Sequence, residues 1–135
     1  MTLAPETLAP RTTDLKVQLR LADGWFTACD LDVLSPGRGV AALLPDGGQV
    51  ALFRGRDGKL YAIDNRDPFT GAAVLSRGLT GTHRGRPFVA SPLLKQRFDL
   101  ATGACLDDEA VRVTTYEVKT ATYEVKAATH EVKAG

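Results

Sequence analysis

The side chains best able to bind a metal are few: two cysteines, Cys29 and Cys105, and two histidines, His83 and His130. No two of them have the short spacings that local zinc, haem or iron–sulfur motifs use, such as Cys-x-x-Cys or His-x-x-x-His. In a reducing cytosol we expect both cysteines to be small buried hydrophobic residues without a disulfide. The sequence therefore predicts no local metal motif.

Motifs for catalysis and phosphate binding are absent or out of context. Residues 37–42 fit the letters of a dinucleotide fingerprint, but Pro36 precedes them and Pro45 would end the helix that the motif requires. No P-loop sequence occurs, and the three serines have no spacing to the histidines that favours a catalytic triad. The acidic run 107–109 is typical of a solvated turn. We therefore expect no active site in this chain itself.

Two segments carry an ordered pattern around a proline. Residues 60–78 read LYAIDNRDPFTGAAVLSRG, and residues 88–103 read FVASPLLKQRFDLATG. They resemble the two cluster-binding loops of Rieske iron–sulfur domains, in which two cysteines hold one iron and two histidines the other. The resemblance places Asp67 and Phe69 at the first Cys and His positions. It places Ser91 and Leu94 at the second Cys and His positions.

The side chains at these four positions determine what the resemblance implies. Phe69 and Leu94 have no lone pair suited to iron, so one of the two irons would have no ligand. We therefore expect this chain to bind no cluster, metal or other cofactor. Hydrophobic side chains are expected to fill the volume of the cluster, because protein interiors are densely packed.

A Rieske-like domain without these ligands is similar to one group in particular, the small subunits of cytoplasmic NAD(P)H-dependent nitrite reductases. The resemblance runs from about Trp25 to Leu106. It implies an accessory subunit that binds and supports a large catalytic subunit, in which the family keeps FAD, an iron–sulfur cluster and sirohaem and reduces nitrite to ammonium in nitrate assimilation. One alternative is a stand-alone Rieske-like interaction module with no redox role. Another is an electron-transfer ferredoxin.

The distribution of charge indicates where such a partner would bind. Residues 54–97 hold nine basic and three acidic groups, although the whole chain has a net charge of only +1. Phe69 and Leu94 would be apolar anchors in the contact, or else fillers of the cluster volume inside the domain. The cations would form a polar rim, although a solvated surface or a salt bridge from Arg66 would also explain them. The predicted partner-binding residues are Arg66, Asp67, Phe69, Arg77, Leu94 and Lys95.

The elements that would position these residues are short strands. Val17, Leu19 and Leu21 alternate with polar residues, which is the pattern of a half-buried strand. Further apolar runs are separated by turn sequences, as in a sandwich or small barrel. The sequence thus predicts an all-β antiparallel fold with one helical turn at residues 30–34, capped by Asp30, and the resemblance implies that this fold is Rieske-like. The further runs are residues 25–29, 40–44, 50–53, 60–63, 88–90, 98–100 and 111–113.

The two ends of the chain differ from its middle. We predict a flexible arm at residues 1–14, a Rieske-like domain at 15–119 with its degenerate cluster lobe at 62–100, and a repeat tail at 120–135. The unit Tyr-Glu-Val-Lys begins at residue 116 and returns seven residues later, and His-Glu-Val-Lys follows after another seven. Residues 111–119 favour a strand, with the later units as a frayed tail or an added hairpin. A coiled coil is the alternative.

Composition excludes several classes of protein. The chain is 44% hydrophobic and 24% charged, as soluble globular domains are. Its longest apolar run, residues 40–44, is far too short for a membrane span, and its start is no secretory signal. Aromatic residues are not interleaved with the basic ones, so nucleic-acid binding is not favoured. We expect a cytoplasmic protein with neither a membrane nor a nucleic acid as partner.

Overall fold

A computed structural model of the chain describes residues 15–122, so the predicted arm and nearly all of the predicted tail lie outside it. The described part contains nine strands and two 3-10 turns. None of its helices is long and apolar enough to cross a membrane. The elements are β1 (Leu15–Leu21), β2 (Gly24–Asp30), η2 (Leu31–Val33), β3 (Val40–Leu43), β4 (Gln49–Arg54), β5 (Leu60–Asp64), η3 (Leu75–Arg77), β6 (Leu79–His83), β7 (Arg86–Ala90), β8 (Arg97–Asp99) and β9 (Val118–Thr122).

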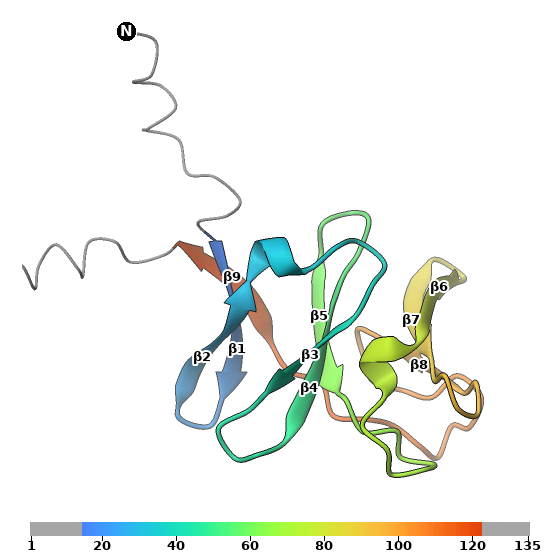
Figure 1. Cartoon of the computed structure of the whole chain (residues 1–135). Helices are drawn as coiled ribbons and strands as arrows, with labels where there is room; N and C mark the ends of the chain where they lie inside the picture. Colours follow the sequence, from blue (N-terminus) through green and yellow to red (C-terminus); the bar gives the residue numbers. More distant parts are fainter. Residues whose placement is uncertain (1–14, 123–135) are drawn as a thin grey trace, which may run out of the picture.

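The strands form three antiparallel sheets of three strands each within the described residues, which confirms the predicted all-β class. Their orders are β2–β1–β9, β3–β4–β5 and β6–β7–β8. Figure 1 shows the three sheets in a row, with β3–β4–β5 in the middle. The last sheet and the loops around it form the predicted cluster lobe.

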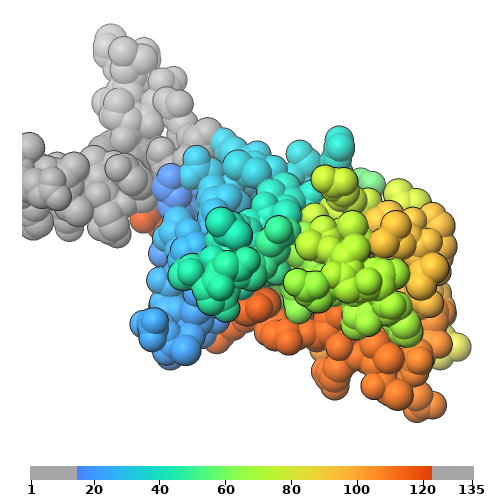
Figure 2. Space-filling view, turned by 60° about the horizontal axis from the view of Figure 1, so that its bottom comes forward, coloured from blue at the N-terminus to red at the C-terminus, as the bar shows by residue number. Residues whose placement is uncertain are grey.

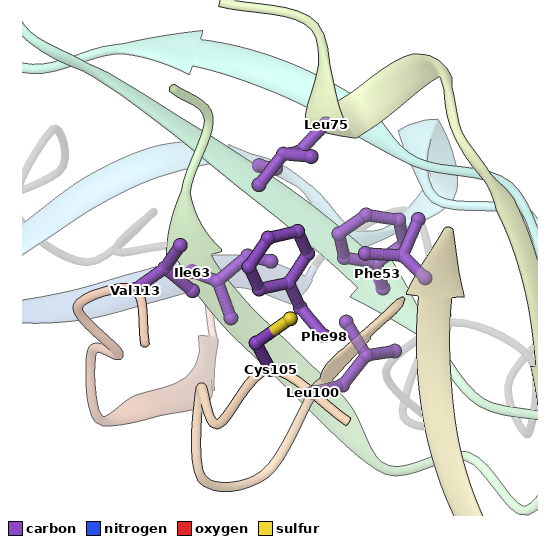
Figure 3. Close-up of a cluster of buried hydrophobic side chains, with 9 residues drawn as sticks. Phe53, Ile63, Leu75, Phe98, Leu100, Cys105 and Val113 are labelled. Atoms are coloured by element: carbon purple, nitrogen blue, oxygen red, sulfur yellow. The ribbon is translucent and has the colours of Figure 1, made fainter. Parts of the chain in front are cut away.

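Two clusters of buried side chains hold the sheets together. The first joins the central sheet to the lobe, and Phe53 and Phe98 are its largest members (Figure 3). The second packs β1 and β2 against the other side of the central sheet, around Leu19 and Leu52. Cys105 belongs to the first cluster and Cys29 packs against the second, and both are free thiols. The cysteines therefore act as packing residues.

Most of the predicted runs are strands, but three details differ. Strand β6 was not predicted, and residues 111–113 make only an isolated bridge between Ala104 and Arg112. The predicted helical turn is the 3-10 turn η2, yet the side chain of Asp30 does not cap it. Residues 79–83 form a hairpin with β7 through a two-residue turn at Arg84 and Gly85, both of which have a positive φ. The ring of Phe88, directly opposite on β7, covers Gly81, where a Cβ would lie 2.8 Å from it.

The first unit of the seven-residue repeat closes the sheet of β1. Its strand β9 pairs with β1 from Leu19–Val118 to Leu15–Thr122, so the first unit is not helical and the sheet extends to Thr122. The amide of Tyr116 donates to the carbonyl of Ala62 at 2.9 Å, which ties the unit to the central sheet as well. The later units lie outside the described residues.

The repeat makes a deletion test possible. Removing residues 116–122 joins Thr115 to Tyr123 and rebuilds the same strand sequence, except that Ala127 takes the position of Thr120. We expect the thermal midpoint to stay within about 4 °C of the parent, whereas ending the chain at Thr115 should lower it by more than about 10 °C. Circular dichroism melts measure both. If the two changes lower the thermal midpoint equally, the second unit cannot replace the first.

Candidate functional site

Two loops of the lobe lie side by side, in lime and gold in Figure 2. The first loop (residues 65–74) follows β5, and the second loop (residues 91–96) joins β7 to β8. Each loop begins with a tight turn around a proline. In the first loop Gly71 has a φ of 82°, a conformation that favours glycine. These are the two segments in which the sequence resembles the cluster-binding loops.

The two positions predicted to replace cysteines meet in a hydrogen bond. The hydroxyl of Ser91 donates to Oδ2 of Asp67 at 2.6 Å, and both residues are fully buried. The other carboxylate oxygen of Asp67 accepts the amide of Phe69 at 2.8 Å. Since hydrogen bonds to a carboxylate are stronger than those between neutral groups, this pair ties the two loops together.

Each loop is also closed by its own backbone. In the first loop the carbonyl of Asp67 accepts the amide of Gly71 at 2.7 Å, and its amide donates to Ala72 at 2.8 Å. In the second loop the amide of Ser91 donates to Gln96 at 2.9 Å, and its carbonyl accepts the amide of Lys95 at 3.1 Å. Asp67 therefore closes the first loop and Ser91 closes the second, each through two backbone hydrogen bonds.

The two positions predicted to replace histidines have different surroundings. Phe69 is half buried and packs on the first core cluster, with its ring centroid 6.3 Å from that of Phe98. Leu94 is 54% exposed at the tip of the second loop. Of the two roles proposed for these residues, Phe69 thus has the contacts of a filler, and Leu94 has the exposure that an anchor needs.

The predicted cations also differ in their contacts. The guanidinium of Arg66 donates to the carbonyl of Gly71 at 2.5 Å and forms no salt bridge with any carboxylate of the described residues. Arg77 is exposed, and the ammonium of Lys95 reaches only the carbonyl of Pro92 at 3.5 Å. Within residues 15–122 neither Arg77 nor Lys95 has a carboxylate partner.

Two other arginines of the lobe are committed to carboxylates. Arg86 lies 2.8 Å from the buried carboxylate of Asp99. Arg97 donates to Asp107, and this hydrogen bond lowers the pKa of that carboxyl and raises the pKa of the guanidinium. These two arginines stabilise the lobe, whereas Arg77, beside the second loop, and Lys95, within it, remain open to a partner.

The donor set of the two loops does not fit a [2Fe–2S] cluster. Such a cluster needs four thiolate or imidazole ligands. Asp67 and Ser91 are buried and hydrogen-bonded to each other, and the side chains of Phe69 and Leu94 have no atom that could ligate iron. In the part of the chain that the structure describes, no group of three or more His, Cys, Asp or Glu side chains could hold a metal ion.

An open groove lies between the β1–β2 turn and the β3–β4 turn, away from the two loops. Its volume is about 400 Å³, and Trp25, Phe26 and Tyr116 are among its lining residues. Burial raises the pKa of the Tyr116 phenol, and the carboxylates of Asp64 and Asp46 raise it further. The phenol therefore stays protonated at neutral pH. It is not an activated nucleophile in this groove.

Sequence reasoning missed two exposed leucines beside the second loop. Leu79 begins β6, and Leu93 precedes Leu94 at the loop tip. The pairing of β6 with β7 brings them to one end of the sheet, because Leu79 lies opposite Ala90, the residue just before the second loop. The position of Leu79 beside the second loop follows only from the pairing of β6 with β7. The sequence of β6 has no apolar alternation from which a strand could be predicted.

Comparison with known proteins gives one family match and close relatives. A family profile described as "Rieske-like [2Fe-2S] domain" matches residues 24–128. The nitrite reductase (NADH) small subunit of Salmonella typhimurium is 48% identical over 96 residues, which cover 70% of this chain and 88% of that protein. The nitrite reductase [NAD(P)H] large subunit of Klebsiella oxytoca is 44% identical over 95 residues, which cover 70% of this chain but only 10% of that protein.

Solved structures agree with this result. The nitrite reductase [NAD(P)H] small subunit of Erwinia carotovora superposes with a TM-score of 0.58 at 50% identity, covering 69% of this chain and 72% of that one. The ferredoxin of carbazole 1,9a-dioxygenase from Nocardioides aromaticivorans superposes with a TM-score of 0.56 at 32% identity, covering 67% and 83%.

Proposed function

Since the chain belongs to the Rieske-like [2Fe-2S] domain family and its closely similar relatives are nitrite reductase small subunits, we propose that it is the accessory small subunit of an NAD(P)H-dependent nitrite reductase. The large subunit reduces nitrite to ammonium, and this chain binds and supports it. The observation that carries the proposal is 48% identity over 88% of a named small subunit.

The Klebsiella oxytoca protein supports the choice of partner. A segment similar to this chain makes up a tenth of a polypeptide named as the large subunit. A domain that is joined to a large subunit in one protein and separate in another is expected to occupy the same place in both assemblies. This observation favours a reductase partner over the alternative of a stand-alone module.

The proposed role includes no electron transfer through this chain. The support comes from the donor set, since Asp67 and Ser91 are hydrogen-bonded to each other and the other two positions are apolar. The flavin, the sirohaem and the iron–sulfur cluster belong to the large subunit in this proposal. The two free cysteines are consistent with a reducing compartment, and we place the complex in the cytoplasm.

The contact with the large subunit is proposed on the lobe, at the two loops. Arg66 hydrogen-bonds the backbone of the first loop, and Asp67 and Phe69 contact the second loop and the core. Leu94, Lys95 and Arg77 face outward and are available to a partner. The first group therefore supports the surface, and the second group touches the partner.

Co-expression with the large subunit tests the proposal. We expect a tagged form of this chain to co-purify with the large subunit, and the chain purified alone from iron-replete cells to contain no iron. A control chain with the same tag but an unrelated β fold should not retain the large subunit. A solitary monomer in the presence of the large subunit would contradict the proposed partner, and stoichiometric iron in the isolated chain would contradict the cluster-free role.

A further inference from the structure

Three of the five exposed large hydrophobic residues in the described part of the chain gather at one end of the β6–β7–β8 sheet. Leu79, Leu93 and Leu94 are 76%, 49% and 54% exposed. Isolated exposed leucines are ordinary, but a group of them at one end of a sheet is typical of an interaction surface.

The backbone brings these side chains to the same place. Leu79 pairs with Ala90, and the second loop that carries Leu93 and Leu94 starts at the next residue. A Cβ built on Gly78 would lie 2.2 Å from the carbonyl oxygen of Ala90, so the backbone of η3 and β6 passes directly against β7. Arg77 therefore lies beside the leucines as well.

The segments that carry the leucines contain only basic charges, and the nearby carboxylate of Asp107 is paired with Arg97, which lies opposite Ala90. No acidic residue occurs between Asp67 and Asp99, and both of these carboxylates are buried. Asp99 is paired with Arg86. Within residues 15–122, Arg77 and Lys95 are left without carboxylate partners at this end of the lobe.

The backbone at Lys95 supports a role for its side chain. Its φ is 71°, in the left-handed region that glycine and asparagine adopt more readily than lysine. Such a conformation is strained for a lysine, and strained backbone occurs preferentially at functional sites. The ammonium makes only a 3.5 Å contact with the carbonyl of Pro92, so nothing within the loop demands a lysine there.

We propose that Leu79, Leu93 and Leu94, rimmed by Arg77 and Lys95, form the docking patch for the large subunit, and that this patch meets an apolar surface bordered by carboxylates. The inference rests on the proposed function and specifies its contact. It extends the contact from the second loop to the start of β6, and adds Leu79 and Leu93 to it. A second copy of this chain is disfavoured as occupant, because two positive patches would repel each other.

Single and double substitutions test the docking patch. The variants are Leu79→Ser and the double variant Leu93→Ser with Leu94→Ser, and Leu43→Ser is the control, since Leu43 is 67% exposed on β3 in another sheet. Isothermal titration of each purified chain into the large subunit measures the affinity. We expect each patch variant to bind at least about tenfold more weakly than the parent, and the control to stay within about twofold.

The outcomes separate the two proposals. If the parent chain binds and the patch variants bind equally well, the docking patch is wrong and the proposed function stands. If the parent chain does not bind, both fail. Sedimentation of the parent chain alone adds a third outcome: a dimer that Leu79→Ser dissociates would assign the patch to self-association and overturn the inference.

Discussion

Replacing Asp67 with alanine is expected to lower the free energy of unfolding by about 3 kcal/mol, among the largest effects of any single substitution in the lobe. The change removes the acceptor of two hydrogen bonds, from the hydroxyl of Ser91 at 2.6 Å and the amide of Phe69 at 2.8 Å. The hydroxyl of Ser91 would remain in a site that water does not reach, the amide of Phe69 would remain partly buried, and the two loops would lose the side-chain link between them. Denaturant titration followed by circular dichroism measures the change.

Two further variants show whether the hydrogen bond between the loops is the cause. Asp32→Ala changes an exposed aspartate and should alter stability by less than about 0.5 kcal/mol. Combining Asp67→Ala with Ser91→Ala should cost clearly less than the sum of the two single changes, because the partners are in direct contact. Additive costs, or a loss below about 1 kcal/mol for Asp67→Ala, would mean that this pair does not hold the loops together.

The double charge reversal Arg77→Glu with Lys95→Glu is expected to slow association with the large subunit by about tenfold or more at low ionic strength. It turns the two unpaired cations of the docking patch into anions that would repel an acidic partner. The difference should shrink with added salt, because screening weakens charge attraction between exposed groups. Stopped-flow or surface-based kinetics at two salt concentrations measure it.

A matched charge reversal elsewhere on the chain is the control. Lys59→Glu with Lys119→Glu changes the net charge equally but lies on the β4–β5 turn and on β9, in the other two sheets. We expect a much smaller effect on the association rate. Equal slowing by the two double variants would indicate a general effect of net charge and would remove Arg77 and Lys95 from the contact.

The sequence predicts those parts of the fold that local patterns determine. The alternation around Val17 and Leu19 and the turn sequences between apolar runs gave most strands and the all-β class. Strand β6 was missed because its side chains do not alternate, and its place follows from its pairing with β7 through the turn at Arg84 and Gly85. Residues 111–113 were overpredicted as a strand, since apolar residues there fill the first cluster without a ladder partner.

For the candidate site, the resemblance supplied the positions but not their contacts. It identified Asp67 and Ser91 as separate replacements, whereas the structure joins them across 24 positions of sequence. It treated Phe69 and Leu94 alike, although one packs on the core and the other is exposed. Leu79 had no signal at all, because its position beside the second loop follows from strand pairing.

The most direct test of the account is a titration of the large subunit with this chain. The rate of nitrite-dependent oxidation of the reduced nicotinamide nucleotide is followed while purified chain without detectable iron is added. If this chain is the accessory subunit, the rate rises and saturates at a fixed molar ratio of the two subunits. A rate that does not respond to the chain, or that rises only after the chain has been loaded with iron, would contradict the account.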